Sequence, residues 1–418
     1  MASSEPNKPS PGGWITDGIV LTIATLIAAV GNYVFQAVMM RHLSWSEFGY
    51  LNATLSLILF TGVPLTAASQ ALTHHLAQVR AFDDAEKIAQ LQAASLKLLR
   101  YLTWVLFAIC ALLLLPVSDY LRFPRMSLAW AGLLLIPVNL WSTLGGSWCA
   151  GLSRFHLLSL LLILGSVVRL VTGTLAVSFY PWAESGISAS IFAGLILASI
   201  AVFSPHHATV ASLRQVLFQR DWLDYGAASL AVAFGAFVFL QGDQIIAQRH
   251  FPGEELGRYS GAGLLGRTVV WASLPVLTVY FTRRSGHHCT FSSPTPLLGI
   301  YLAMIGASAL GIFLLRIPLL QLLLGVHDAE LASLTTRFAL VMVPIGILQA
   351  MGCHYLAARR LPECHLFGGC GLIYAVTLFL FGQTPSLMLN RMGGVATASV
   401  VILGLVSVMR RSKNGSRP

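Results

Sequence analysis

The chain alternates between long apolar stretches and short polar connections from one end to the other. Each apolar stretch holds about 20 residues, which at about 1.5 Å per helical residue is enough to cross a hydrocarbon layer of roughly 30 Å. We count twelve such stretches. They are approximately residues 15–40, 49–72, 101–118, 128–150, 156–180, 185–203, 227–248, 260–281, 296–315, 331–356, 366–382 and 388–409.

The length of these stretches decides the fold class. A backbone in lipid has no water to bond, so membrane-spanning segments are either helices or strands of a closed barrel. The stretches are too long and too uniformly apolar for barrel strands, so we predict an all-α membrane protein with about twelve transmembrane helices. Composition agrees, because 56% of the 418 residues are hydrophobic and only 10% are charged, too few to cover a water-soluble surface.

A short polar segment occurs twice. RHLSWSEFG at residues 41–49 follows the first stretch, and RHFPGEELG at residues 249–257 follows the seventh, 208 residues later. The identical positions are Arg41/Arg249, His42/His250, Glu47/Glu255 and Gly49/Gly257. A second pair of segments, IPVNLWSTLGGSWCAG from Ile136 and VPIGILQAMGCHYLAA from Val343, is spaced by 207 residues and aligns Pro137 with Pro344.

These echoes predict two related halves of six helices. An even number of spans makes both halves enter the membrane in the same direction, so the repeat is parallel, about an axis along the membrane normal. Such a pair of bundles encloses a central cleft, and rocking one bundle against the other opens the cleft alternately to each side. Prolines at matched positions, such as Pro64 and Pro275, predict kinked helices that shape the cleft.

The same patterns divide the chain into five parts. Residues 1–13 form a polar tail, predicted to be disordered, without the basic and apolar regions of a cleaved signal peptide. Residues 14–203 form the N-terminal six-helix bundle, 204–226 a cytoplasmic linker, 227–409 the C-terminal bundle and 410–418 a basic tail. We expect residues 80–100 to form an interfacial helix that connects the second and third spans, and residues 213–222 a similar connector.

Basic residues set the orientation. With the N-terminus inside, sixteen of the 26 Lys and Arg residues fall in cytoplasmic loops and tails, which predicts an integral protein of the bacterial cytoplasmic (inner) membrane with both termini in the cytoplasm. This bias also accounts for the formal charge of +10. No soluble segment is long enough to build a basic face for nucleic acid, so we expect no nucleic-acid partner.

Motifs for chemistry are missing from the sequence. There is no Gly-rich phosphate loop and no nucleophile arrangement, the six cysteines form no CxxC pair, and the paired histidines lack further ligands at metal-binding spacing. A membrane glycosyltransferase or glycan polymerase would need a long outer loop with paired carboxylates, and the outer connections here are short. We therefore expect no enzyme, no metal and no cofactor.

The sequence resembles a known family at several places. MMRHLSWSEFGYLNATLSLI, its echo GDQIIAQRHFPGEELGRYSGAGLL and the GLSRF segment at 151–155 are similar to polysaccharide biosynthesis transporters. These are oligosaccharide flippases of the multidrug/oligosaccharidyl-lipid/polysaccharide exporter superfamily. The resemblance covers most of the chain as a loose pattern and implies translocation of a lipid-linked glycan. Some members have fourteen helices and more charge in the cavity, which leaves the substrate open.

Ionisable side chains within a span are costly unless they are paired or hydrated, so each is a candidate for function. Arg169 lies near the middle of the fifth span, Asp243 about two turns from the end of the seventh, and Arg267 and Arg337 at a similar depth in the eighth and tenth. A lipid-linked pyrophosphate is anionic, and Arg binds phosphate oxygens in bidentate fashion. We therefore expect Arg169, with Arg267, to contact the pyrophosphate. The amides expected to bond sugar hydroxyls are Gln241, Gln244, Asn139, Asn32, Gln36 and Gln70.

Several alternatives stay open at this stage. Asp243 either couples transport to H⁺ or Na⁺ or pairs structurally with Arg267 or Arg169, and the amides either bind sugar or bridge helices. The expected partners are a lipid-linked glycan and membrane lipids, and a glycan polymerase or glycosyltransferases in the same assembly. Two other functions compete with a flippase. One is a multidrug or toxin extrusion cation antiporter, and the other is a non-transporting scaffold of a glycan assembly complex.

Overall fold

The structure is a computed structural model, and it describes residues 11–81, 85–152, 154–203, 220–285, 295–325 and 328–415. Every regular element in these ranges is helical. The N-terminal half holds α1 (Pro11–His42), α2 (Trp45–Thr61), α3 (Val63–Ala81), α4 (Ala85–Leu112), α5 (Leu114–Tyr120), α6 (Met126–Gly151), α7 (Phe155–Phe179) and α8 (Ala183–Phe203). The C-terminal half holds α10 (Arg220–Phe237), the π-helical turn η2 (Val238–Gly242), α11 (Asp243–His250), α12 (Gly253–Trp271), α13 (Leu274–Ser285), α14 (Thr295–Leu324), α15 (Ala329–Ala357), α16 (Leu361–Phe381) and α17 (Pro385–Gly415).

Each of the twelve predicted spans coincides with a helix or a broken helix. Within the described ranges, nine stretches are long and apolar enough to cross a membrane, and the bent pair α2–α3 makes a tenth. The two remaining predicted spans are α8, which is apolar over Ala183–Ser199, and the broken pair α12–α13. The prediction of an all-α membrane protein is therefore confirmed.

The second and eighth spans break at matched places. The axes of α2 and α3 differ by 47° across Gly62, and Pro64 is the second residue of α3. In the other half α12 ends at Trp271, and Pro275 is the second residue of α13. Proline is tolerated in the first turn of a helix because its missing N–H has no partner there. The matched prolines therefore start new helices after each break.

Four boundaries differ from the sequence predictions. Residues 220–226 are the first two turns of α10 and not linker, because Tyr225 is buried against the neighbouring helices. Residues 85–100 continue into the third span as the single helix α4, so they do not form a separate interfacial helix. Helix α1 starts at Pro11, inside the predicted tail, and α17 runs on to Gly415. Residues 1–10, 204–219 and 416–418 lie outside the described ranges.

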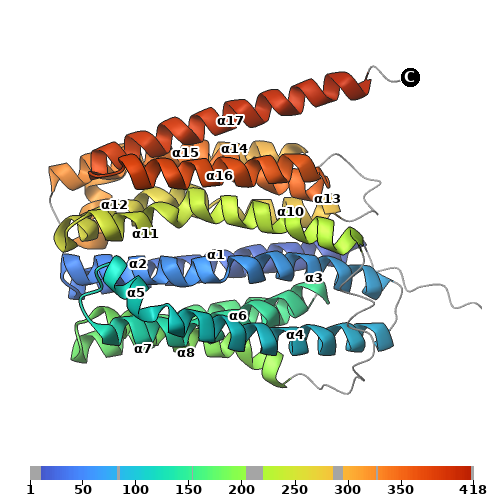
Figure 1. Cartoon of the computed structure of the whole chain (residues 1–418), viewed down its shortest axis with the longest axis horizontal. Helices are drawn as coiled ribbons and strands as arrows, with labels where there is room; N and C mark the ends of the chain where they lie inside the picture. Colours follow the sequence, from blue (N-terminus) through green and yellow to red (C-terminus); the bar gives the residue numbers. More distant parts are fainter. Residues whose placement is uncertain are drawn as a thin grey trace, which may run out of the picture.

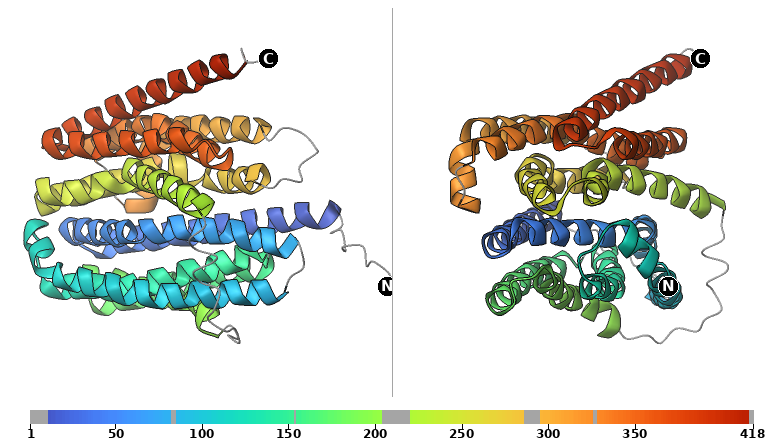
Figure 2. Two further views of the ribbon diagram at one scale, coloured as in Figure 1. Left: turned by 45° about the vertical axis from the view of Figure 1, so that its right-hand side comes forward. Right: turned by 60° about the vertical axis from the view of Figure 1, so that its left-hand side comes forward.

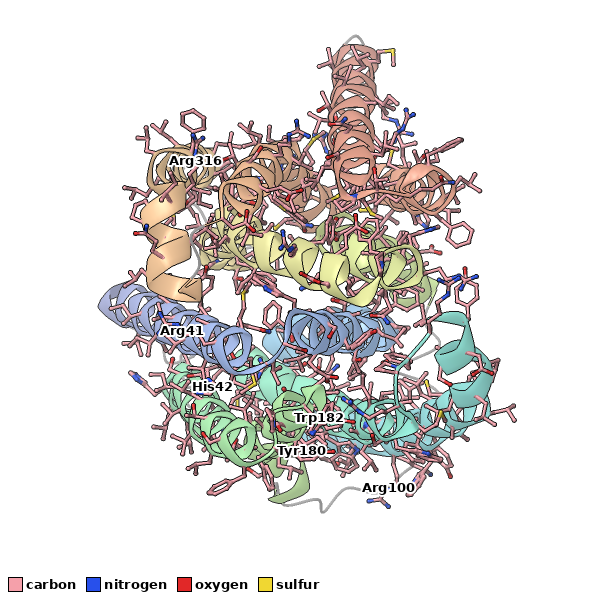
Figure 3. All side chains as sticks on the ribbon, turned by 90° about the vertical axis from the view of Figure 1, so that its left-hand side faces the viewer. Arg41, His42, Arg100, Tyr180, Trp182 and Arg316 are labelled. Atoms are coloured by element: carbon pink, nitrogen blue, oxygen red, sulfur yellow. The ribbon has the colours of Figure 1, made fainter. Side chains whose placement is uncertain are left out.

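The two halves form two layers (Figures 1 and 2). Helices α1–α8 lie in one layer and α10–α17 in the other, and the start of α1 and the end of α17 lie toward the same end of the molecule. We call the opposite end the loop end; it carries the links Leu43–Ser44 and Phe251–Pro252 of the repeated segments, and Figure 3 looks onto it. Among the described residues, the loop end is also where the α7–α8 link with Tyr180 and Trp182 lies.

Equivalent residues make equivalent contacts in the two halves. Ser44 and Pro252, which precede α2 and α12, have nearly the same backbone angles, with φ −63° for both and ψ 158° and 156°. Thr73 of α3 donates to the Ser147 carbonyl of α6 at 3.5 Å, and 207 residues later Tyr280 of α13 bonds His354 of α15 at 2.5 Å. The repeat seen in the sequence is thus a repeat of structure.

The halves meet at the loop end through the repeated glycines. A β-carbon on Gly257 of α12 would lie only 1.9 Å from the Trp45 carbonyl oxygen of α2, and one on Gly49 would lie 2.9 Å from the Gly257 nitrogen. Small residues let helix backbones approach this closely. Ser56 adds a polar contact across the halves by donating to Gln241 at 3.1 Å. The repeated Gly therefore marks the place where the two halves cross.

Glu47, the repeated Glu of the N-terminal half, joins three elements at the loop end. Glu47 accepts hydrogen bonds from Arg125 at 2.7 Å and from the Ala183 backbone N–H at 3.0 Å. Arg125 also bonds Glu184 at 3.2 Å and lies 4.0 Å from the centre of the Trp182 ring. These contacts tie α2, the link before α6 and the start of α8 into one loop-end cluster.

The loop-end cluster gives a prediction about acid stability. Burial raises the pKa of the Glu184 carboxyl, but hydrogen bonds from Ser127 and Arg125 outweigh it, so the pKa lies below its ordinary value of 4.5. A lowered pKa means that the carboxylate stabilises the fold above pH 4.5 and that this contribution is lost as pH falls further. We expect Glu184→Gln to lower Tm in detergent at pH 7, with the difference from the wild type shrinking below pH 4.5. A difference that does not change with pH would contradict this assignment.

Candidate functional site

The seventh span departs from regular α-helix where the candidate residues lie. In the π-helical turn η2, which lies between α10 and α11, the hydrogen-bond ladder is shifted, and such turns are often found at functional sites. Side chains from three other helices bond carbonyl oxygens here. Gln349 of α15 donates to Ala236 at 2.8 Å, Tyr374 of α16 to Phe239 at 3.4 Å, and Arg267 of α12 to Leu240 at 2.9 Å. The broken helix is thus held in place by its neighbours.

Asp243, the first residue after this turn, forms a buried ion pair with Arg267. Its Oδ2 accepts from Arg267 Nη2 at 2.5 Å and from the Tyr259 hydroxyl at 2.6 Å, and Asp243 is fully buried. The Arg267 guanidinium also lies 5.1 Å from the centre of the Phe338 ring. Of the alternatives left open by the sequence, structural pairing with Arg267 is the one the geometry shows for Oδ2. Oδ1 is buried and has no partner among the described residues.

Gln244 lies beside this pair and is also buried. Its Nε2 donates to Ser260 Oγ, and Ser260 in turn donates to the Leu256 carbonyl at 2.8 Å, so the contact joins α11 to α12 within the C-terminal half. Its Oε1 has no partner among the described residues. Gln244 therefore packs inside the C-terminal bundle.

Arg169 occupies a separate site in the N-terminal half, between α7 and α1. It lies in the middle of α7, and its Nη1 donates to Asn32 Oδ1 at 3.0 Å. The guanidinium carbon lies 4.3 Å from the centre of the buried Phe35 ring, within the range of a cation–π contact. No described carboxylate lies within ion-pair distance of Arg169, and its Nε is buried without a partner there.

Two further polar atoms on α1 have no described partner. The Tyr33 hydroxyl and Gln36 Oε1 are buried, and neither makes a hydrogen bond to the described residues. Because buried polar atoms are nearly always paired, unpaired groups on α1, the helix whose Asn32 and Phe35 contact Arg169, indicate a place for a ligand or water. We call Arg169, Asn32, Phe35 and Gln36 the α1–α7 site.

The other predicted residues lie elsewhere. Gln241 accepts from Ser56 across the two halves, and the Asn139 amide lies beside Gly62 at the α2–α3 break. Arg337 is exposed on α15, where its Nη1 lies 3.5 Å from Ser386 Oγ at the start of α17. The side chain of Gln70 lies outside the described part of the structure.

The structure thus sorts the candidates into two sites and not one. Asp243, Arg267 and Gln244 belong to the C-terminal bundle, and Arg169, Asn32 and Gln36 belong to the α1–α7 site. Sequence reasoning missed the residues that hold these groups. They are Phe35, Tyr259, Gln349 and Tyr374. Aromatic residues in apolar spans carry no signal that separates these from ordinary packing residues.

Comparisons with known proteins identify the fold. No protein-family model matches the chain, and no curated protein matches it. It is similar in structure to a multidrug-resistance MATE transporter of the MOP superfamily in an inward-facing conformation, with 11% identity, TM-score 0.69, and coverage of 96% of this chain and 100% of the other.

A lipid II flippase, MurJ, in an inward closed conformation has 14% identity and TM-score 0.70 over 94% of this chain and 87% of its own. A MOP superfamily transporter from Pyrococcus furiosus, described as having a binding pocket of reverse polarity, has 14% identity and TM-score 0.59, with 95% of each chain covered. The chain therefore has the fold of MOP superfamily transporters, which confirms the predicted fold class of about twelve helices in two six-helix halves. The central cleft between the halves stays a prediction.

Proposed function

We propose that this protein is a membrane transporter, a flippase that moves a lipid-linked oligosaccharide or polysaccharide precursor across the bacterial inner membrane by alternating access. The fold supports transport, because the solved structures similar to this chain are transporters or flippases. The site supports an anionic substrate. We propose the pyrophosphate of the lipid carrier as the group that Arg169 binds.

The charge inside the spans carries this proposal. Arg267 is neutralised by Asp243 at 2.5 Å, whereas Arg169 has an amide and an aromatic ring as its described neighbours and keeps its charge. A half-buried cation within a span is costly without a carboxylate and is stabilised by an anion that enters the site. Its Nη1 donates to Asn32, and its buried Nε has no hydrogen-bond partner among the described residues. We propose that this edge of the guanidinium bonds the phosphate oxygens when the substrate enters.

The same observation weighs against a cation antiporter. An organic cation needs a negative group at membrane depth, and the fully buried carboxylate of Asp243 already has a guanidinium on Oδ2. We propose that Asp243 acts as the counter-ion of Arg267. A coupling H⁺ or Na⁺ would have only the unpaired Oδ1 of Asp243 available there. A scaffold without transport would leave the charge of Arg169 unused.

Orientation and partners follow from the sequence. We propose that both termini lie in the cytoplasm, so the loop end faces the outside of the inner membrane, and that the substrate is delivered by glycosyltransferases and received by a glycan polymerase. The membrane lipids surround the exposed apolar faces of helices such as α7 and α14.

The experiment replaces Arg169. We expect Arg169→Ala to reduce translocation of a pyrophosphate-linked glycolipid in proteoliposomes by about tenfold to a hundredfold, because a hydrogen bond to a charged group contributes roughly 1.5–3 kcal/mol. Arg169→Lys keeps the charge but not the two-pronged geometry, so its activity should be intermediate. Translocation is measured as protection of the labelled sugar from a membrane-impermeant reagent.

Arg316→Ala is the matched control. Arg316 also lies over a phenylalanine ring, that of Phe313 at 5.4 Å, but on α14, away from the α1–α7 site, so its loss should leave translocation unchanged. A folded Arg169→Ala protein that moves the glycolipid at the wild-type rate would reject the proposal. Uptake of organic cations that depends on Asp243, with no glycolipid movement, would favour the antiporter.

A further inference from the structure

The repeat places Phe35 and Asp243 at equivalent positions. GNYVFQAVMMRH ends α1 at residues 31–42, and FLQGDQIIAQRH ends α11 at residues 239–250, again 208 residues later. The shared Arg-His ending fixes this register, and Gln36 falls on Gln244 within it. Phe35 then falls on Asp243, and Asn32 falls on Leu240. The two halves therefore carry different chemistry at the same places.

In each half, an arginine from another helix contacts the residues at these two equivalent positions. In the C-terminal half Arg267 bonds the Leu240 carbonyl at 2.9 Å and the Asp243 carboxylate at 2.5 Å. In the N-terminal half Arg169 bonds the Asn32 amide oxygen at 3.0 Å and lies 4.3 Å from the centre of the Phe35 ring. The position of Asn32 and Leu240 supplies a neutral oxygen acceptor in both halves. The position of Phe35 and Asp243 supplies an aromatic face in the N-terminal half and a carboxylate in the C-terminal half.

We propose that Phe35, with Asn32, makes the α1–α7 site selective for anions by positioning the Arg169 guanidinium without neutralising it. An aromatic ring attracts a cation through its quadrupole and brings no opposite charge, whereas a carboxylate cancels the charge and takes a guanidinium edge. Phe35 is fully buried, and its ring fills the space beside Gly173 of α7, so its position under Arg169 is fixed by packing. This inference rests on the proposed function, because it assumes that Arg169 meets an anionic substrate.

The test adds a carboxylate beside Arg169 and leaves the arginine in place. Phe35→Asp imitates the C-terminal half, and Phe35→Asn is its matched control, because the two variants leave the same cavity and differ only in charge. Loss of the cation–π contact alone should reduce translocation by about fivefold in Phe35→Asn. Neutralisation of the Arg169 charge should lower the translocation rate of Phe35→Asp by a further tenfold or more, to that of Arg169→Ala.

Asn32→Asp is the variant that least disturbs the fold. It is nearly isosteric and places a carboxylate on the atom that already accepts from Arg169 Nη1. If Phe35→Asp does not fold, this variant alone decides the question. We expect Asn32→Asp to lose translocation by about tenfold or more while its Tm in detergent does not fall, because the new ion pair stabilises the fold.

Binding of inorganic pyrophosphate gives a second readout that a structural role would not change. At constant ionic strength, pyrophosphate should raise the Tm of the wild type and of Phe35→Asn, and not that of Phe35→Asp, Asn32→Asp or Arg169→Ala. Wild-type translocation by Asn32→Asp, or equal activity of Phe35→Asp and Phe35→Asn, would overturn the inference while Arg169→Ala is still inactive. Full activity of Arg169→Ala would overturn the proposed function itself.

Discussion

Replacing Gly257 with valine is expected to prevent the two halves from meeting at the loop end and to stop transport. The β-carbon alone would lie 1.9 Å from the Trp45 carbonyl oxygen, and this neighbour is backbone that cannot rotate away. Overpacking costs about 1–3 kcal/mol in side-chain cores. A clash with backbone should therefore lower the population of the arrangement in which the halves meet at the loop end by about two orders of magnitude. Translocation that needs this state should fall in proportion.

Spin labels at His42 and His250 report the arrangement directly. These repeat-related residues end α1 and α11 on opposite sides of the crossing, and their separation, measured in a cysteine-replaced background, should increase in Gly257→Val. Gly404→Ala is the control, since a β-carbon on Gly404 of α17 meets no atom within 4 Å. An unchanged label distance together with wild-type translocation would show that the crossing of Gly49 and Gly257 is not needed for closure.

Replacing Asp243 with alanine should be the most destabilising change in the C-terminal half. It leaves the Arg267 guanidinium buried, with the Leu240 carbonyl and the Phe338 ring as its remaining partners among the described residues. Removing one partner of a buried ion pair costs about 3–5 kcal/mol, whereas replacing both partners with apolar residues is often neutral. We therefore expect a large fall in Tm for Asp243→Ala and recovery of most of it in the double variant Asp243→Leu/Arg267→Met, both followed by thermal denaturation in detergent.

The exposed Asp119 of α5 is the matched control for this prediction. Asp119→Asn removes a carboxylate at the loop end, where solvent reaches it, and should change Tm little. A double variant no more stable than Asp243→Ala would mean that Asp243 and Arg267 do not stabilise the fold as a pair.

The sequence predicted the parts of the fold that depend on distance along the chain. Twenty apolar residues in a row specify a span, and Pro64 and Pro275 locate the breaks because proline cannot continue a helix from within. The repeated Arg-His segments predicted two related halves before any contact between helices was known. The start of α10 was placed too late, because residues 220–226 are polar enough to resemble a connector, and only packing of Tyr225 shows that they are helix.

The candidate site was harder to predict because it depends on which way side chains face. Depth along a helix follows from the sequence, which places Arg169, Arg267 and Arg337 within apolar spans. The direction in which a side chain faces around its helix does not follow from the sequence. The sequence therefore grouped Arg337 with the others, although the structure shows it exposed beside Ser386. The choice between Arg267 and Arg169 as partner of Asp243 also needed coordinates, since each of the three lies on a different helix.

The side-chain bonds to η2 and its neighbours restrict how the C-terminal half can change shape. Ala236, Phe239 and Leu240 are each anchored through a carbonyl to a different helix, α15, α16 or α12. Straightening the seventh span would break all three anchors together, so we expect the C-terminal half to move as one piece. We expect bending during a transport cycle to occur in the opposite layer. There α1 is one uninterrupted helix of 32 residues, and Arg169 of α7 bonds its Asn32.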